Sequence, residues 1–154
     1  MADILALFDL DRTLVSHDTD EQWIEFLLEH GKLDRGAYDA ANRDLVARYD
    51  RGEAGAFEFT QFYPSTLVPF TVDELAMLHS DFMRERVLPS IPVAARDLIA
   101  KHRRLGHFML LTTATSRFLT APVARALGFE NYIATEPEMR DGRYTGRVAG
   151  TPNM

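Results

Sequence analysis

The sequence predicts an α/β fold: a doubly wound parallel sheet into which a helical cap is inserted. Two apolar runs, residues 3–9 and 107–112, have the length of strands and lack polar alternation, as is typical of parallel strands buried on both faces. Between them, residues 15–88 carry capping signals and helical spacing but no strand pattern. From residue 92 onward helices and strands alternate, an order that favours helices packed on a parallel sheet.

The helical insert divides into segments with recognisable ends. A capping-box pattern at Thr19 opens the first helix, which ends at Gly31. A second helix is expected over residues 34–50, and another capping box at Thr71 opens a helix to about Arg86. Aromatic residues in a small helical insert mostly pack against each other, so we expect four of them to form cap core and not a substrate pocket: Phe57, Phe59, Phe62 and Tyr63.

The rest of the chain reads as alternating helices and strands followed by a hairpin. Gly106 and Gly128 mark the ends of two helices, because glycine often stands just past a helix. Residues 113–116 are expected to form the turn after the second strand. The expected elements are helices over 92–105 and 118–127, strands over 107–112 and 132–135, and a hairpin turn at 140–143.

Composition is that of a soluble globular protein. The 154 residues, 46% of them hydrophobic, suit a core of residues 1–14 and 89–154 with an inserted cap of residues 15–88. A net charge of −6 argues against a general binder of nucleic acids or membrane surfaces. The absence of cysteine excludes disulfides and thiolate zinc sites. No apolar run resembles a membrane span or a signal peptide, so we expect a cytoplasmic protein.

The most informative motif follows directly after the first apolar run and reads Asp9-Leu10-Asp11-Arg12-Thr13. Residues two apart on a strand point to the same side, so both aspartates should project together beyond its carboxyl end. Two such carboxylates repel each other unless a cation or a proton separates them, which suits a hard metal ion and acid–base chemistry. Elsewhere the same residues would form a turn or a helix cap. Their position after a buried strand favours a site.

A second polar group follows the second strand. Thr113 and Ala114 lie where the strand 107–112 ends and a helix soon begins. A hydroxyl and backbone N–H groups in such a place can donate to phosphate oxygens. The competing interpretation is a helix cap formed by Thr115 or Ser116. Ligands of doubly wound sheets bind beyond the carboxyl ends of the strands, so this group and the acidic motif are expected to form one site.

Together these features resemble the haloacid dehalogenase (HAD) superfamily of phosphotransferases. They are most similar to its phosphoserine-phosphatase-like branch, subfamily IB, which carries a helical cap between its first two motifs. The acidic motif matches the first family motif in full, and Thr113 matches the second. The resemblance implies a Rossmann-like doubly wound core and a Mg²⁺-dependent phosphomonoester hydrolase. It also implies a small phosphorylated metabolite as substrate, phosphoserine-like or histidinol-phosphate-like.

The resemblance also assigns roles to individual residues. Asp9 would be the nucleophile that forms an aspartyl phosphate, and Asp11 the general acid and base. Mg²⁺ would be held by a carboxylate oxygen of Asp9 and the main-chain carbonyl of Asp11. Thr113 and the N–H groups of Leu10, Asp11 and Ala114 would hold the phosphate oxygens.

Three nearby residues have further interpretations. Asp18 stands where phosphoserine phosphatases carry an acid that meets the substrate's amino group, or it is a helix cap or a solvated charge. Arg12 would face a substrate anion or lie in solvent. Thr13 is expected to order the loop.

The chain departs from the family pattern toward its C-terminal end. The family's third motif is a lysine that balances the phosphate's charge, and its fourth supplies acids to the metal site. Neither has a match, because Lys101 precedes the second strand and no acidic pair on a strand follows Thr113. We therefore expect weak Mg²⁺ binding and a rate lowered by about a hundredfold or more. The alternative function is that of a catalytically impaired phosphate- or metal-binding fragment or pseudoenzyme. A receiver-like domain phosphorylated on Asp9 is disfavoured by the helical insert.

The missing motifs also predict an open strand edge. In the family the first strand is central, so without the later segment residues 4–8 would present unpaired backbone groups and apolar side chains. Such an edge favours self-association or a complementing segment. Apart from this and the small phosphorylated metabolite, we expect no nucleic-acid or membrane partner.

Overall fold

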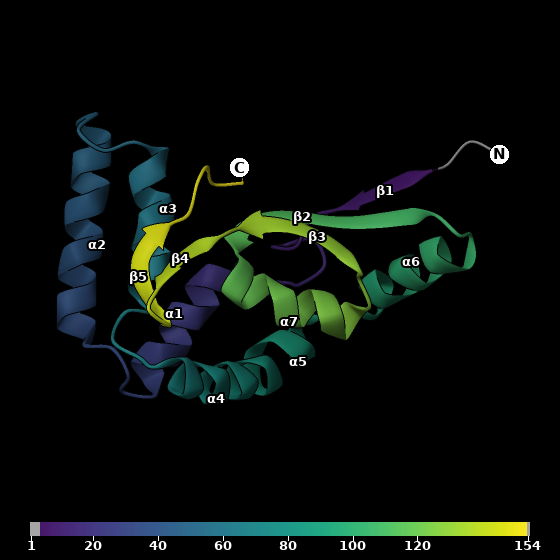
Figure 1. Ribbon diagram of the computed structural model, residues 1–154, viewed down its shortest axis with the longest axis horizontal. Coiled ribbons are helices and arrows are strands. Elements are labelled where there is room, and N and C mark those ends of the chain that lie inside the picture. The colour runs from purple at the N-terminus through teal and green to yellow at the C-terminus, as the bar shows by residue number, and fades with distance from the viewer. Residues whose placement is uncertain (1–3, 154) are drawn as a thin grey trace.

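A computed structural model describes residues 4–153, apart from the side chains of Ala56 and Phe59. A short first strand is followed by a run of helices and then by strands on either side of one further helix (Figure 1). The elements are β1 (Leu5–Phe8), α1 (Thr19–Glu29), α2 (Arg35–Asp50), α3 (Ala56–Ser65), α4 (Val72–Phe82), the π-helical η1 (Met83–Val87), α5 (Leu88–Ser90), α6 (Val93–Arg104), β2 (Phe108–Ser116), α7 (Arg117–Leu127), β3 (Asn131–Thr135), β4 (Pro137–Arg140) and β5 (Arg143–Val148).

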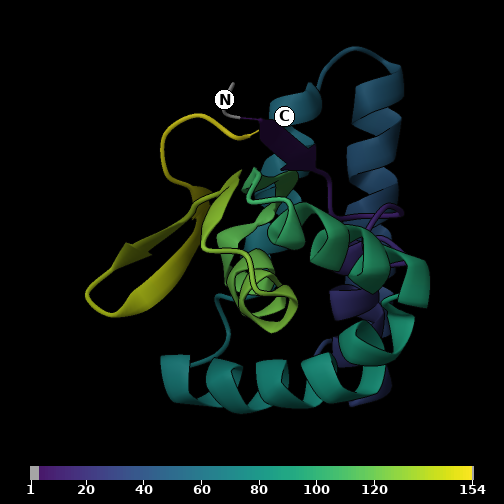
Figure 2. The same cartoon turned by 90° about the vertical axis from the view of Figure 1, so that its right-hand side faces the viewer.

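The strands β1, β2 and β3 form one parallel sheet in that order. β1 pairs with the first half of β2, from Leu5 opposite Phe108 to Phe8 opposite Leu111. Crossovers between parallel strands are right-handed, and the strand order does not reverse within the described chain. The crossover helices α6 and α7 therefore lie on the same face of the sheet, as Figures 1 and 2 show.

The side chains of β1 that point to the opposite face of the sheet are exposed among residues 4–153, so the expectation that the first strand is buried on both faces was wrong. Along β1, Ala6 and Phe8 are buried on the helical side, whereas Leu5 and Leu7 are 54% and 60% exposed. The physical reason is that both crossovers run on one side. The large apolar side chains exposed on this open face are Leu5, Leu7, Phe108 and Ile133.

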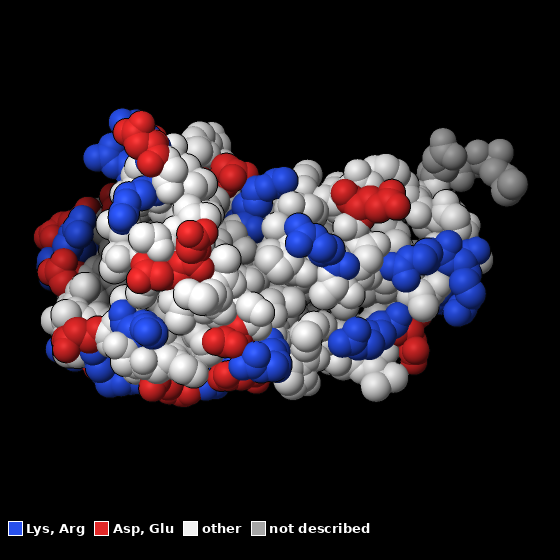
Figure 3. All heavy atoms as spheres, turned by 60° about the horizontal axis from the view of Figure 1, so that its bottom comes forward, with Lys and Arg blue, Asp and Glu red and all other residues white. Residues whose placement is uncertain are grey.

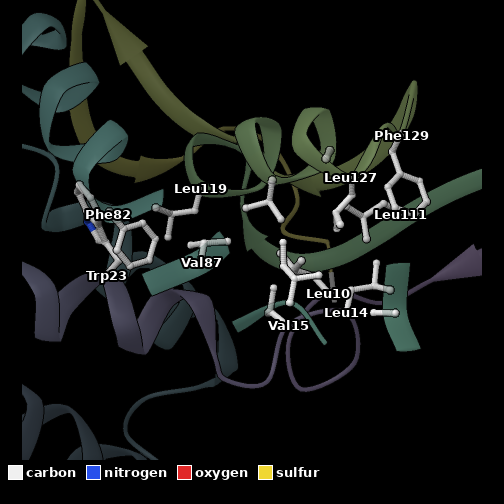
Figure 4. Packing of buried hydrophobic residues seen from close by; sticks show 14 of the residues in the cluster. Leu10, Leu14, Val15, Trp23, Phe82, Val87, Leu111, Leu119, Leu127 and Phe129 are labelled. Carbon is white, nitrogen blue, oxygen red and sulfur yellow. The ribbon is translucent and has the colours of Figure 1, made fainter. Parts of the chain in front are cut away.

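One continuous core joins the helical insert to the covered face of the sheet. Figure 4 shows side chains from the loop after β1, from α1, from α4 and from α7 directed toward one another. Trp23 of α1 makes edge-to-face contacts with Phe82 of α4 and Phe118 of α7, with ring centroids 5.3 and 5.4 Å apart. Rings in this geometry attract each other beyond their burial, so the insert is held firmly against α7.

The hairpin formed by β4 and β5 packs on the helical insert and does not extend the sheet (Figure 1). Gln61 of α3 accepts a hydrogen bond from the backbone N–H of Val148, at 2.9 Å. Gly146 has a φ of +80° and lies so close to the segment after α3 that a Cβ atom there would come within 2.8 Å of the Val68 side chain. Glycine is therefore required at this contact for both conformation and space.

Figure 3 shows charges of both signs over the helical end of the molecule and mainly basic side chains toward the end formed by α6. Residues 101–104 in the last turn of α6 are all basic. Arg103 donates to the carbonyl oxygens of Leu127 and Gly128 at the end of α7, at 3.0 and 3.2 Å, satisfying groups that the helix leaves unpaired. No described helix is both long and apolar enough to cross a membrane.

Two local predictions were wrong. Asp18, and not Thr19, caps α1, since Asp18 Oδ1 accepts from the backbone N–H of Glu21 at 3.1 Å. Residues 113–116 do not form a turn: β2 continues through them, and Ser116 is still paired with β3 after a shift in register. The strand thereby carries its polar end further toward the helical insert.

Candidate active site

The acidic motif forms a tight loop directly after β1. Leu10 is fully buried, and its carbonyl oxygen accepts backbone hydrogen bonds from Thr13, Leu14 and Val15, at 3.3, 2.9 and 3.1 Å. The Asp9 side chain is exposed at the carboxyl end of the strand, where its Oδ2 accepts from the Thr13 hydroxyl at 2.7 Å. The loop thus orients one oxygen of Asp9, and Oδ1 has no hydrogen-bond partner among residues 4–153.

The carboxylate of Asp11 is held by donors from two separate elements. Its Oδ1 accepts from the backbone N–H and the hydroxyl of Thr19 at the start of α1, at 2.7 and 2.5 Å. Its Oδ2 accepts from the hydroxyl of Thr115 near the end of β2. Asp11 therefore connects the helical insert to the sheet, and its carboxylate is held in one orientation.

The end of β2 carries the second polar group. Thr113 is buried, and its hydroxyl oxygen accepts from the backbone N–H of Thr115 at 3.2 Å. Asn153 Nδ2 donates to the Thr113 carbonyl oxygen at 2.7 Å and to the Thr112 hydroxyl at 3.1 Å. The Asn153 backbone also donates to the hydroxyl of Thr135 in β3, at 3.1 Å. The C-terminal segment thus fixes the ends of β2 and β3 side by side.

A cavity of about 200 Å³ lies between this strand end and the helical insert. The insert contributes Asp18 and Asp20 from the start of α1 and Tyr63 from α3. β2 contributes Ala114 and Ser116. The remaining walls are Thr60, Pro64, Thr115 and Thr135.

The cavity is acidic. Burial raises the pKa of the Asp20 carboxyl well above its usual range, and the charges of Asp11 and Asp18 raise it further, against a hydrogen bond from the Ser116 backbone. Burial and the charges of Asp20 and Asp18 likewise raise the pKa of the Tyr63 phenol. None of the lining residues is Lys, Arg or His. The Asp20 carboxyl and the Tyr63 phenol are therefore harder to deprotonate in the cavity than in water.

Comparison with known proteins agrees with this arrangement. Residues 6–154 match the model of the haloacid dehalogenase-like hydrolases. The chain belongs to this family. A histidinol-phosphatase from Neisseria meningitidis is 35% identical to it over 151 residues, which cover 97% of this chain and 68% of that protein. A crystal structure of a protein of unknown function from Bordetella pertussis matches with a TM-score of 0.90 at 45% identity, covering 99% of this chain and 69% of that one.

More distant HAD structures share the fold. A phosphoserine phosphatase solved as a phospho-aspartyl intermediate analogue matches with a TM-score of 0.64 at 17% identity, covering 97% of this chain and 64% of that chain. The family resemblance, the α/β fold and the expectation of a HAD-type phosphatase are therefore confirmed. This chain spans about two thirds of the length of each of these proteins.

In this HAD chain Asp9, Leu10 and Asp11 lie in the loop after β1, and Thr113 and Ala114 lie in the last half of β2. The hydrogen bond from Thr115 to Asp11 directly joins the ends of β1 and β2. Asp18 caps α1, as one of its interpretations had it, and it also lines the cavity. Its role toward a substrate amino group stays a prediction. Arg12 has a left-handed φ of 55°, and its exposed guanidinium pairs with Glu21 at 3.2 Å. This geometry favours the solvent interpretation of Arg12, and a role toward substrate stays a prediction.

Sequence reasoning missed several residues of the site. Thr115 stands two residues after Thr113 on the same strand, which was a usable signal, whereas Thr19 looked like a helix cap. Asn153 carried no signal, because its contacts depend on how the C-terminal segment folds back. Tyr63 packs against the hydrophobic core, as expected, and it also lines the cavity, which was not expected. Of the other three aromatic residues, Phe57 is half exposed, Phe62 packs on Tyr38, and the side chain of Phe59 lies outside the described residues.

The oxygen ligands that follow β1 are of the type that Mg²⁺ prefers, but there are few of them. The Asp9 carboxylate and the Asp11 carbonyl are hard oxygen donors of the type that Mg²⁺ binds, with water completing its octahedron. Within the described part of the chain, no three His, Asp or Glu side chains come together as a metal site. A Mg²⁺ ion here would therefore rely mainly on water.

Proposed function

We propose that this chain is a Mg²⁺-dependent phosphomonoesterase that acts on a small phosphorylated metabolite through an aspartyl phosphate on Asp9. The observation that carries the proposal is the hydrogen bond from Thr115 to Asp11, in a chain of the HAD hydrolase family. It connects the loop that holds Asp9 and Asp11 to the part of β2 that carries Thr113, and Thr115 also lines the cavity. The names of the relatives support a phosphorylated metabolite as substrate.

The reaction follows from the positions of the two aspartates. Oδ1 of Asp9 attacks phosphorus, an O–P bond forms, and the bond from phosphorus to the ester oxygen breaks. Asp11 gives its proton to the leaving oxygen. It then takes a proton from a water molecule, which attacks the aspartyl phosphate and releases inorganic phosphate. Thr113 and the N–H groups of Leu10, Asp11 and Ala114 donate to the phosphoryl oxygens.

The partners of Asp11 suit its two protonation states. Thr19 and Thr115 contact it through hydroxyl groups, which donate to a carboxylate and can turn to accept from a carboxylic acid. Bound Mg²⁺ would reduce the repulsion between the Asp9 carboxylate and an incoming phosphate dianion.

Asp18 and the helical insert that carries it would determine which class of substrate binds. We assign residues 15–88 to a cap and residues 1–14 and 89–154 to the core, with Asp18 facing the amino group of a phosphoserine-like or histidinol-phosphate-like substrate. The position of Asp18 in the wall of a cavity that Ala114 also lines supports this assignment.

The test is hydrolysis of p-nitrophenyl phosphate with and without Mg²⁺, for the chain and its Asp9→Asn variant. The matched control is Asp141→Asn, the same change in the exposed turn between β4 and β5. We expect turnover that needs Mg²⁺, persists in the control and is lost in Asp9→Asn. A folded chain without turnover would contradict the proposal and favour a binding-only fragment.

We further propose that the open face and the free edge of β1 bind a second copy of the chain or a complementing segment. Apolar side chains beside unpaired backbone groups favour such contacts. Size-exclusion chromatography with light scattering tests this with Leu7→Lys, which should reduce association. Met77→Lys, at a similarly exposed site on α4, is the control. A monomer before and after both changes, unaffected by an added complementing segment, would contradict the proposal.

A further inference from the structure

The pairing of β2 with β3 is irregular at the part of β2 that is assigned to phosphate binding. Thr112 lies opposite Ile133 and Ser116 opposite Thr135, so the same interval spans four residues on β2 and two on β3. Within the part of the chain that the structure describes, residues 113–115 have no register partner in β3. Extra residues in one strand disturb the hydrogen bonds of the sheet and change the direction of side chains. Other contacts must therefore hold this segment in place.

Asn153 supplies contacts to both strands at this irregularity. Its backbone N–H donates to the Thr135 hydroxyl at 3.1 Å, which attaches it to β3. Its Nδ2 donates to the Thr113 carbonyl oxygen at 2.7 Å and to the Thr112 hydroxyl at 3.1 Å, which attaches it to β2. A carbonyl oxygen accepts and cannot donate, so only the nitrogen of the Asn153 amide can face Thr113. The contact therefore requires an amide donor at this position.

One peptide group connects Asn153 to a proposed phosphate donor. The carbonyl of Thr113 and the N–H of Ala114 belong to the same peptide group, which is planar and trans, so they point in opposite directions. When Asn153 holds the carbonyl oxygen, it also fixes the direction of the N–H. Ala114 lines the cavity, and its N–H is one of the groups assigned to the phosphate.

The Thr113 hydroxyl is held by the same segment. Its oxygen accepts from the backbone N–H of Thr115 at 3.2 Å, which leaves its own proton to donate. Successive side chains of a strand point to opposite faces, so Thr113 and Thr112, whose hydroxyl Asn153 contacts, face opposite sides of the sheet. Asn153 therefore acts on the Thr113 hydroxyl through the backbone and does not approach the phosphate.

We propose that Asn153 is a positioning residue for the phosphate, whose side-chain amide fixes the Ala114 N–H and the Thr113 hydroxyl in the directions that bind phosphoryl oxygens. The inference rests on the proposed function, from which it takes the assignment of these two groups. The competing role for Asn153 is structural, because the same hydrogen bonds attach the C-terminal segment to the sheet.

Two variants remove the amide and one control separates the two roles. Asn153→Ala removes the side chain, and Asn153→Leu keeps a similar size without a donor, so it carries the test if the alanine variant does not fold. The matched control is Thr112→Val, which removes the other acceptor of the same Nδ2 and leaves the contact with Thr113 in place. A structural role predicts similar effects for all three variants, since each removes a hydrogen bond between the C-terminal segment and β2.

The measured quantity is the Kd of inorganic phosphate, the product of the proposed reaction. It is determined by calorimetry with Mg²⁺ present, under conditions in which circular dichroism shows each variant to be folded. Weaker hydrogen bonds to a charged ligand predict that Kd rises about tenfold in both Asn153 variants and by less than about twofold in Thr112→Val. Equal binding by the parent chain and the Asn153 variants, or equal weakening in Thr112→Val, would overturn the inference.

Hydrolysis of p-nitrophenyl phosphate gives a second readout. Poorer phosphate binding should raise KM in the Asn153 variants, whereas an inactive misfolded fraction would lower the apparent kcat and leave KM unchanged. An unchanged KM in the Asn153 variants would contradict the inference.

These measurements separate the inference from the proposed function. If the chain binds phosphate but hydrolyses no ester, the proposed function fails, and weaker binding in the Asn153 variants alone still supports the inference. If the chain hydrolyses p-nitrophenyl phosphate and all variants bind phosphate equally, the proposed function stands and the inference fails. A parent chain that binds no phosphate contradicts the inference.

Discussion

The two faces of the sheet differ sharply although the same strands form both. The face under α6 and α7 buries Ala6, Phe8 and Leu111 in a core that continues into the helical insert. The other face leaves Leu5 and Leu7 more than half exposed. The difference comes from topology, because two right-handed crossovers in one direction cover only one side.

This contrast extends to the candidate active site. Asp9 directly follows β1, which among residues 4–153 is paired on one side only, whereas Thr113 lies on β2, which is paired on both sides. The loop that follows β1 is connected to β2 by the hydrogen bond from Thr115 to Asp11, and to α1 by that from Thr19 to Asp11. The loop after β1 is therefore positioned by packing on the covered face and by these hydrogen bonds, and not by strands on both sides of β1.

The largest effect should come from truncating a leucine on the covered face. Leu111→Ala removes a fully buried side chain and should lower the free energy of unfolding by about 3 kcal/mol, since transfer and cavity terms add. Leu7→Ala, on the open face, should change it by less than about 0.5 kcal/mol. Urea unfolding measures both. Similar losses for the two variants would mean that something covers the open face in solution.

The second prediction concerns pH and a residue in the core between α4 and α7. Burial lowers the pKa of His79 from 6.5 to about 4, and its ring packs against Trp23 and Phe118. The unfolded chain therefore binds the proton more readily. The contribution of neutral His79 to the free energy of unfolding should be complete above its pKa in the unfolded chain and should be lost as the pH falls toward its pKa in the folded protein. Between about pH 7 and pH 5 the free energy of unfolding should fall by about 2 kcal/mol.

His79→Leu isolates this contribution when urea unfolding is measured at both pH values. The raised pKa of Asp20 acts in the opposite sense, favouring the folded state at low pH, but it is common to both proteins. The parent chain should therefore lose more stability than the variant on acidification. Parallel losses would show that His79 is not held neutral in the folded core.

The third prediction tests the connection between the strand ends. Thr115→Val removes the hydroxyl that donates to Asp11, and should lower kcat by about tenfold with a stability loss of about 1 kcal/mol. Thr145→Val removes a hydroxyl bonded to the Glu138 carboxylate at 2.6 Å on the hairpin and serves as the control. An unchanged kcat in Thr115→Val would show that Thr19 alone suffices to position Asp11.

Much of the fold was predictable because its signals are local. Helix ends at glycines, the capping box at Thr71 and the apolar runs of the strands all correspond to elements in the structure. The exposure of Leu5 and Leu7 was not predictable, because an unbroken apolar strand gives no information on how many faces its neighbours cover. The acidic motif likewise predicted that Asp9 and Asp11 follow β1 directly, whereas Thr113, expected in a turn, lies within β2.

The remainder of the site depends on contacts between distant segments. Asn153 reaches Thr113 across 40 residues of chain, and Thr115 reaches Asp11 across 104. No local pattern marks such pairs. Asp20 stands in a helical first turn, where an acid usually serves the helix dipole, and only the fold shows that it lines a cavity.

The most direct test of the account is to look for the covalent intermediate itself. The chain would be mixed with p-nitrophenyl phosphate and Mg²⁺, quenched in acid during turnover, digested and examined by mass spectrometry. The account predicts that a phosphoryl group appears on the peptide containing Asp9, is stable in acid, and is absent in Asp9→Asn. Turnover without any phosphorylated peptide, or with the group on another residue, would contradict it.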